Sequence, residues 1–134
     1  NIQAALGVAQ LESLPSYLNK KKIINDYYRF AINDLEHFSV LESPDYSDNN
    51  LWLNILEISD DCHLDVDSLI NIFEKNKIQT RPVWTLNHMQ KPFRDFQNHR
   101  IENAYKIVEK SLCMPSSVNL KTSHIDKIVS VLSE

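Results

Sequence analysis

The stretch Arg81–His88, with the sequence RPVWTLNH, contains residue types that binding chemistry uses. Arg81 carries a permanent positive charge on a planar fork that suits a carboxylate or a phosphate. Trp84 offers a flat apolar face on which a sugar or a base can stack, and His88 follows it. The stretch begins at the end of a predicted strand, where binding groups often lie. Residue chemistry alone leaves two interpretations open: a binding site, or an ordinary loop around a packed tryptophan.

A possible metal site in the segment SDDCHLDVD, residues 59–67, is the weaker candidate. The segment lies between a predicted strand and a predicted helix, where aspartates commonly form turns and cap helices. Its spacing matches neither an EF-hand nor a zinc site, so we expect no metal. The residues considered are Asp60, Asp61, Cys62, His63, Asp65 and Asp67.

Nucleophilic catalysis is also poorly supported. Ser116 and Ser117 follow Pro115 at a predicted helix end, without an acid–histidine pair nearby in the sequence. A triad can assemble from distant residues, but nothing singles these serines out. Three histidines on or beside predicted helices are more typical of exposed or half-buried side chains than of bases: His37, His99 and His124.

The composition limits the class of protein. The 134 residues, 43% of them apolar, fit one folded domain over 1–134. The net charge of −4 is spread along the chain without a basic stripe, so we expect no nucleic-acid partner. No apolar run is long enough for a membrane span, and we expect no signal peptide. Cys62 and Cys113 show no paired spacing, which favours a reduced, cytoplasmic chain and leaves one disulfide possible.

The single glycine, Gly7, argues against a self-contained nucleotide-binding enzyme, because phosphate-cradling loops need glycines. The chain also opens without a methionine, so we expect a piece of something larger. Small residues around Gly7 in the segment 2–11 indicate either tight packing inside the domain or an interface with another domain or subunit. Lysines 20–22 are interpreted as a solvated helix face.

Apolar spacing predicts an α+β fold, with a long N-terminal helix and a small, largely antiparallel sheet that carries helices on one side. Pro15 marks a fresh helix or a kink, and the strand hydrogen bonding in 78–84 is expected to stop at Pro82. Asp65 or Asp67 caps one helix, and Thr122 or Ser123 caps the last. The predicted helices cover 2–11, 16–35, 66–77, 98–112 and 121–134, and the predicted strands cover 38–43, 51–58 and 78–84.

Three blocks of the chain resemble the C-terminal domain of the DegT/StrS-type sugar aminotransferases, which use pyridoxal phosphate. They are NIQAALGVAQLESL (1–14), KNKIQTRPVWTLNHMQKPF (75–93) and SLCMPSSVNLKTSHIDKIVSVL (111–132). Within this family, RPVW…H and LCMPSS are most similar to members that act on keto-deoxy UDP-N-acetylhexosamines, for bacillosamine- or legionaminic-type sugars.

The resemblance implies the small C-terminal domain of a fold type I aminotransferase, which moves an amino group from glutamate to a nucleotide sugar for surface polysaccharide biosynthesis. His88, with Trp84 and Arg81, would border the sugar-nucleotide site. The cofactor lysine would lie upstream of Asn1, so this chain is expected to hold no cofactor or catalytic residue and to be inactive alone. Its expected partners are its own N-terminal large domain and the second subunit of a homodimer, and it would shape the substrate mouth and the dimer edge.

Two other interpretations stay open. One is a stand-alone interaction module that has the same fold without the chemistry. The other is an unrelated small α+β binding protein, in which the three ordered similarities arise by chance.

Overall fold

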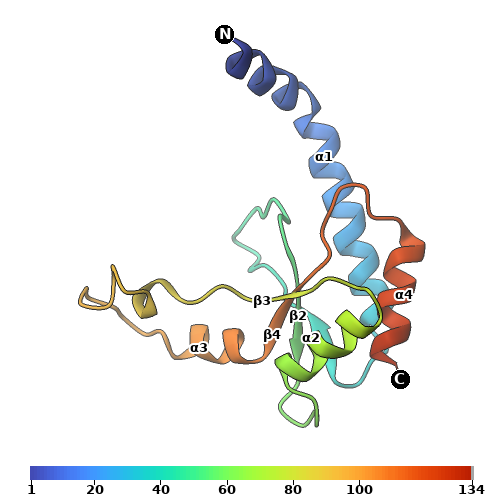
Figure 1. Ribbon diagram of the computed structural model, residues 1–134, viewed down its shortest axis with the longest axis vertical. Helices are drawn as coiled ribbons and strands as arrows, with labels where there is room; N and C mark the ends of the chain where they lie inside the picture. The colour runs from blue at the N-terminus through green and yellow to red at the C-terminus, as the bar shows by residue number, and fades with distance from the viewer. Residues whose placement is uncertain (134) are drawn as a thin grey trace.

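The computed structural model describes residues 1–133, and it confirms the predicted α+β class (Figure 1). A four-stranded sheet carries helices against one face, and one long helix projects beyond the rest of the molecule. The elements are α1 (Ile2–Ile32), β1 (Phe38–Val40), β2 (Asn54–Ile58), α2 (Val66–Lys75), β3 (Arg81–Pro82), the 3-10 helix η1 (Asn87–Met89), α3 (Glu102–Glu109), β4 (Ser111–Met114) and α4 (Thr122–Leu132).

The sheet has the order β1-β2-β4-β3, and all its neighbouring strands are antiparallel. At its centre Leu56 of β2 lies opposite Leu112 of β4, and both side chains are fully buried. The edge strand β3 covers only two residues of the predicted strand 78–84, and it ends at Pro82, as predicted, because proline lacks the N–H that would continue the ladder. The apolar face of the sheet packs with the buried residues of α1, α2 and α4 in one core.

Strand β4 corrects the sequence prediction. A helix was expected over 98–112, but α3 ends at Glu109 and Ser111–Met114 pairs with β2. Leu112 and Met114 are both buried in the core, so the strand buries apolar area that a surface helix would leave in water. Apolar spacing in so short a run fits a helix end and a strand equally well.

Helix α1 runs without interruption through Pro15, so the prediction of a fresh helix there is wrong. Proline removes one backbone hydrogen bond, which a long helix can lose without ending. Only the last third of α1 is packed, through Ile24, Tyr28 and Ile32 at a spacing of four residues. The first half extends away from the body with its large apolar side chains exposed: Ile2, Leu6, Val8, Leu11, Leu14 and Leu18.

Of the two predicted helix caps, one is confirmed and the other is wrong. Asp65 is the N-cap of α2, and its Oδ1 accepts from the Ser68 N–H at 2.8 Å, which selects one of the two predicted residues. Helix α4 begins after Lys121, whose backbone N–H donates to His124 Nδ1 at 3.3 Å. Thr122 and Ser123 therefore lie inside this helix, and their prediction as caps is wrong.

Polar contacts join α1 to the ends of β2 and β4. The Tyr28 hydroxyl donates to the Pro115 carbonyl at 3.0 Å, and Asn25 Nδ2 donates to Asn54 Oδ1 at 3.0 Å. Asn54 in turn donates from its backbone N–H and its side chain to Ser116 Oγ, at 2.8 and 2.9 Å. Because buried polar groups are costly without partners, this network favours one register of α1 on the sheet.

Tyr28→Phe should lower the free energy of unfolding at pH 7 by about 1–2 kcal/mol, because the Pro115 carbonyl loses its donor. Burial raises the pKa of Tyr28 above its value in the unfolded chain, which is about 10. The wild type should therefore lose stability as the pH rises above about 10, by up to ~1.4 kcal/mol per pH unit from this group. Tyr28→Phe lacks this titrating group, so the difference in free energy of unfolding between wild type and variant should become smaller above about pH 10.

Urea unfolding at pH 7 and pH 10.5 measures both effects. Tyr46→Phe is the control, because Tyr46 is 92% exposed. An unchanged difference between wild type and Tyr28→Phe at the two pH values would contradict the prediction.

Candidate functional site

The stretch singled out from the sequence lies where the chain leaves the sheet. Strand β3 is joined to β4 only by the pairs Arg81–Cys113 and Pro82–Leu112. Beyond it, residues 83–101 extend away from the body and return through α3; we call this segment the arm (Figure 1). Every residue of 91–100 in it is exposed. The arm is thus tied to the domain at its two ends and by a few side-chain contacts.

Trp84 is not the packed core residue of an ordinary loop. Its side chain is 62% exposed, and its ring lies against that of Trp52, which precedes β2 and is 57% exposed. The ring centroids are 5.0 Å apart and the planes are tilted by 54°, a common geometry for interacting aromatic pairs. This pair leaves a large indole surface open to a ligand or to another part of a larger protein.

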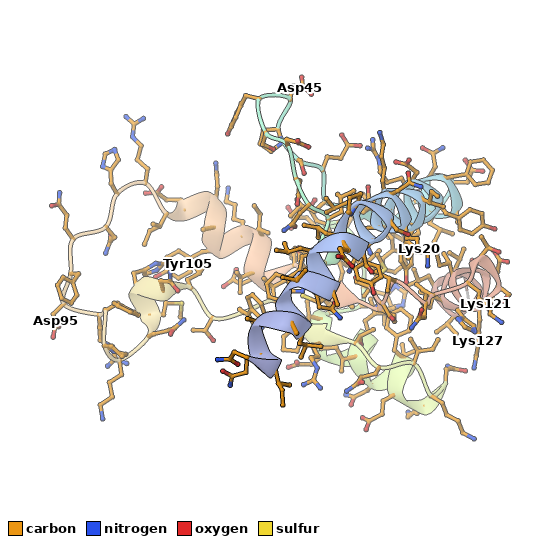
Figure 2. All side chains as sticks on the ribbon, turned by 90° about the horizontal axis from the view of Figure 1, so that it is seen from above. Lys20, Asp45, Asp95, Tyr105, Lys121 and Lys127 are labelled. Carbon is orange, nitrogen blue, oxygen red and sulfur yellow. The ribbon has the colours of Figure 1, made fainter. Side chains whose placement is uncertain are left out.

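His88 is held by Tyr105. The His88 Nε2 atom lies 2.8 Å from the Tyr105 hydroxyl, and the rings meet edge to face with centroids 5.1 Å apart. His88 sits in η1 and Tyr105 in α3, so the contact joins the outgoing part of the arm to the helix through which the chain returns; Figure 2 shows Tyr105 beside η1. Because Nε2 is engaged, Nδ1 is the ring nitrogen that remains for a ligand. Sequence reasoning did not identify Tyr105.

Arg81 is exposed, and it forms no ion pair within residues 1–133. Its guanidinium is therefore available to an anion. The structure gives the three predicted residues separate surroundings: Trp84 contacts Trp52, His88 contacts Tyr105, and Arg81 lies on the sheet edge. All three lie either in β3 or in the arm that follows it.

Lys21 corrects the interpretation of lysines 20–22 as a solvated face. Its Nζ donates to the Trp52 carbonyl at 2.7 Å and also to the Ser116 carbonyl. Partial burial lowers the pKa of Lys21, since desolvation disfavours the charged form. Lys20 and Lys22 are exposed, as expected. Lys21 thus links α1 to the backbone that carries Trp52.

A serine, a histidine and an aspartate meet elsewhere, but not as a catalytic triad. Ser59 Oγ and Asp61 Oδ1 lie 3.5 and 3.6 Å from the same atom, His37 Nδ1. A proton relay needs the acid and the serine on opposite nitrogens of the ring. The hydrogen bond from Ser59 lowers the pKa of Asp61. This group orders the turn after β2.

Three further candidates, Asp60, Asp65 and Ser116, have structural contacts. Asp65 caps α2, and Asp60 lies 3.5 Å from Lys110. Within residues 1–133 no three histidine, cysteine or acidic side chains are grouped as metal ligands. Ser116 Oγ donates to the Met114 carbonyl at 2.9 Å as well as accepting from Asn54, so its hydroxyl is fully engaged. No helix in the described part of the chain is long and apolar enough to cross a membrane.

The sequence matches the model of the DegT/DnrJ/EryC1/StrS aminotransferase family over residues 1–133. EpsN of Bacillus subtilis, provisionally named a pyridoxal phosphate-dependent aminotransferase, is 28% identical over 98% of this chain and 34% of its own length. The dTDP-4-amino-4,6-dideoxy-D-glucose transaminase of Escherichia coli is 24% identical, with 98% of this chain and 36% of its own length covered. The chain thus spans about a third of the length of these relatives.

Solved structures share the fold. PseC of Helicobacter pylori, described as an aminotransferase involved in the biosynthesis of pseudoaminic acid, superimposes with a TM-score of 0.81 at 17% identity. The match covers 98% of this chain and 36% of that one. At this identity the likeness shows the architecture alone.

The contact between His88 and Tyr105 makes a testable prediction. Tyr105→Phe should speed amide hydrogen exchange in Asn87–Gln90 by roughly 2- to 10-fold, because an exposed hydrogen bond contributes about 0.5–1.5 kcal/mol. His88→Ala should have a similar effect, and the double variant should exchange little faster than either single one. Additive effects of the two substitutions would show that the rings do not act as a pair.

Proposed function

The chain belongs to the DegT/DnrJ/EryC1/StrS aminotransferase family, and we propose that it is the C-terminal domain of a longer enzyme that aminates a nucleotide sugar. In this proposal, the enzyme passes an amino group from glutamate to a keto-deoxy sugar for surface polysaccharide biosynthesis. The observation that carries the proposal is the family match over residues 1–133, combined with the exposed arm that bears Trp84 and His88.

The finer substrate is a UDP-linked keto-deoxy N-acetylhexosamine of the bacillosamine or legionaminic type. Support comes from the RPVW…H and LCMPSS segments, which resemble members acting on such sugars. Among the relatives, the transaminase of Escherichia coli is named for a dTDP sugar, and a relative from Caulobacter vibrioides is named a GDP-perosamine synthase. The relatives therefore support a nucleotide sugar in general, and the UDP assignment rests on the two segments.

The roles of the site residues follow from their surroundings. Arg81 would attract the diphosphate, because its guanidinium has a fixed charge and no competing acid within residues 1–133. Trp84 would stack on the nucleotide through its exposed indole. His88 would hydrogen-bond the sugar through Nδ1, while Tyr105 fixes the ring through Nε2. These groups bind and orient the substrate, and none is proposed to move a proton.

The residues of this chain do not fit pyridoxal phosphate itself. The cofactor, which acts as an electron sink, bonds to a lysine and needs a charged partner at its ring nitrogen. Here Lys21 donates to two carbonyls, Lys110 lies beside Asp60, and the remaining lysines are exposed. We therefore propose that residues outside 1–133 hold the cofactor, and that this chain is inactive alone.

The exposed half of α1 supports the proposal of further domains. Its apolar side chains have no partner within residues 1–133, although exposed apolar patches commonly mark interfaces. We propose that the N-terminal large domain and the second subunit of a homodimer cover it. Cys62 and Cys113 are both free thiols, so no disulfide joins them, and free thiols fit a cytoplasmic enzyme.

A stand-alone interaction module is the alternative function. The lack of a suitably placed lysine within residues 1–133 would suit such a module equally well. The two functions differ in one respect: only the first predicts amination of a nucleotide sugar by the full-length natural protein.

The enzyme function is tested with the full-length protein, pyridoxal phosphate, glutamate and a UDP-linked keto-deoxy sugar. His88→Ala should raise the KM for the sugar by roughly 10-fold and leave the KM for glutamate unchanged, since one hydrogen bond to substrate contributes about 1–1.5 kcal/mol. His99→Ala, in the exposed part of the same arm, should change neither value. Equal KM values for wild type and His88→Ala would remove this residue from the site.

The interface function of α1 is tested with the 134-residue chain. Sedimentation should show concentration-dependent association, because the exposed apolar face has no cover. Leu6→Lys should abolish it, whereas Glu12→Lys, on the same exposed segment but on another face of the helix, should not. A chain that stays monomeric at millimolar concentration would contradict the proposed interface.

A further inference from the structure

The backbone around Trp52 is held on both sides. On its N-terminal side, Asn50 Oδ1 accepts from the Trp52 N–H at 3.1 Å and Asn49 Oδ1 accepts from the Leu51 N–H at 2.8 Å. Leu51 has a φ of 53°, an uncommon conformation for a side chain of this kind. On its C-terminal side, Lys21 Nζ donates to the Trp52 carbonyl at 2.7 Å. The Trp52 backbone is thus fixed to α1 and to the asparagine that lies two residues before it.

Lys21 also connects Trp52 to the core. Its second acceptor is the Ser116 carbonyl, and Ser116 Oγ accepts from Asn54, which is buried at the start of β2. The backbone that carries the exposed indole of Trp52 is therefore joined to the core of the domain. Trp84 belongs to the arm, which has few contacts of its own. The ring contact between them is a direct link from the body to the arm.

The geometry of the pair shows how a ligand would use it. A planar ring needs about 3.5 Å on each side, so two rings that sandwich a ligand must lie about 7 Å apart. The centroids of Trp52 and Trp84 are 5.0 Å apart with a tilt of 54°, which leaves no room between them. A ligand would instead meet the outer face of Trp84, and Trp52 would support that ring from behind.

We infer that Trp52 is a positioning residue for Trp84, and that Lys21 fixes Trp52 through its carbonyl, so that Trp84 presents one ordered indole face to the nucleotide sugar. This inference rests on the proposed function for its ligand. The physical gain is entropic: a side chain that is already ordered loses less freedom when substrate binds.

The bracing contact is tested directly by fluorescence, because Trp52 and Trp84 are the only two tryptophans of the 134-residue chain. Trp52→Phe and Trp52→Ala both leave Trp84 as the sole tryptophan, which can be excited selectively over the five tyrosines, and they differ only in whether a ring supports it. Trp84 should show lower anisotropy and stronger acrylamide quenching in Trp52→Ala. Equal values in the two variants would overturn the bracing role.

Lys21 is tested in the same background. In Trp52→Phe, adding Lys21→Met should lower the anisotropy of Trp84, whereas adding Lys20→Met should not, because Lys20 is exposed on the same helix turn (Figure 2). Far-ultraviolet circular dichroism and thermal unfolding identify any variant that has failed to fold. Identical anisotropy of Trp84 in the two lysine variants would show that Lys21 does not help to position Trp84.

The consequence for substrate is tested in the full-length protein. Trp52→Ala should raise the KM for the nucleotide sugar by roughly 2- to 10-fold, the range expected for ordering one side chain, and leave kcat and the KM for glutamate unchanged. Trp52→Phe should restore most of the affinity. An unchanged KM in Trp52→Ala, with an active wild type, overturns the inference alone. A wild type without aminating activity overturns the proposed function and the ligand assigned to Trp84, while the fluorescence still decides the bracing role.

Discussion

The pairing of β2 with β4 is the constraint on which the rest of the structure depends. Leu56 and Leu112 face each other across it at the centre of the core, with no exposed surface. Strand β3 reaches the sheet only through β4, by two residue pairs, so the position of the arm depends on this strand. The residues just after β4 also receive the polar contacts from α1. A loss of this pairing would therefore release both α1 and the arm.

Much of the fold could be predicted because its signals are local. Helix α2 followed from apolar spacing and an aspartate cap, and the end of β3 followed from Pro82. Strand β4 could not be predicted, since its four residues become a strand only through pairing with β2, which is far away in sequence. The single helix α1 was missed for the opposite reason: a local helix breaker, Pro15, is outweighed by the helical turns on either side of it.

The candidate site could also be predicted only where its signals are local. Residue type and position after a strand pointed to Trp84 and His88, but their partners come from distant segments. Trp52 and Tyr105 carry no local sign of these contacts, and Lys21 looked like one of three solvated lysines. The functional class came from the family resemblance, which the match over residues 1–133 supports. From charge and burial alone, this stretch would be described as an exposed loop with aromatic residues, and no substrate class could be assigned to it.

The exposed half of α1 and the arm both extend away from the packed body, which fits a domain that completes its surfaces against further protein. The most direct measurement is a crystal structure of the full-length protein with pyridoxal phosphate and a keto-deoxy nucleotide sugar bound. We predict that His88 Nδ1 lies within hydrogen-bond distance of the sugar and that the outer face of Trp84 lies against the nucleotide. An arm that lies far from the cofactor, with these side chains packed on protein instead, would contradict it.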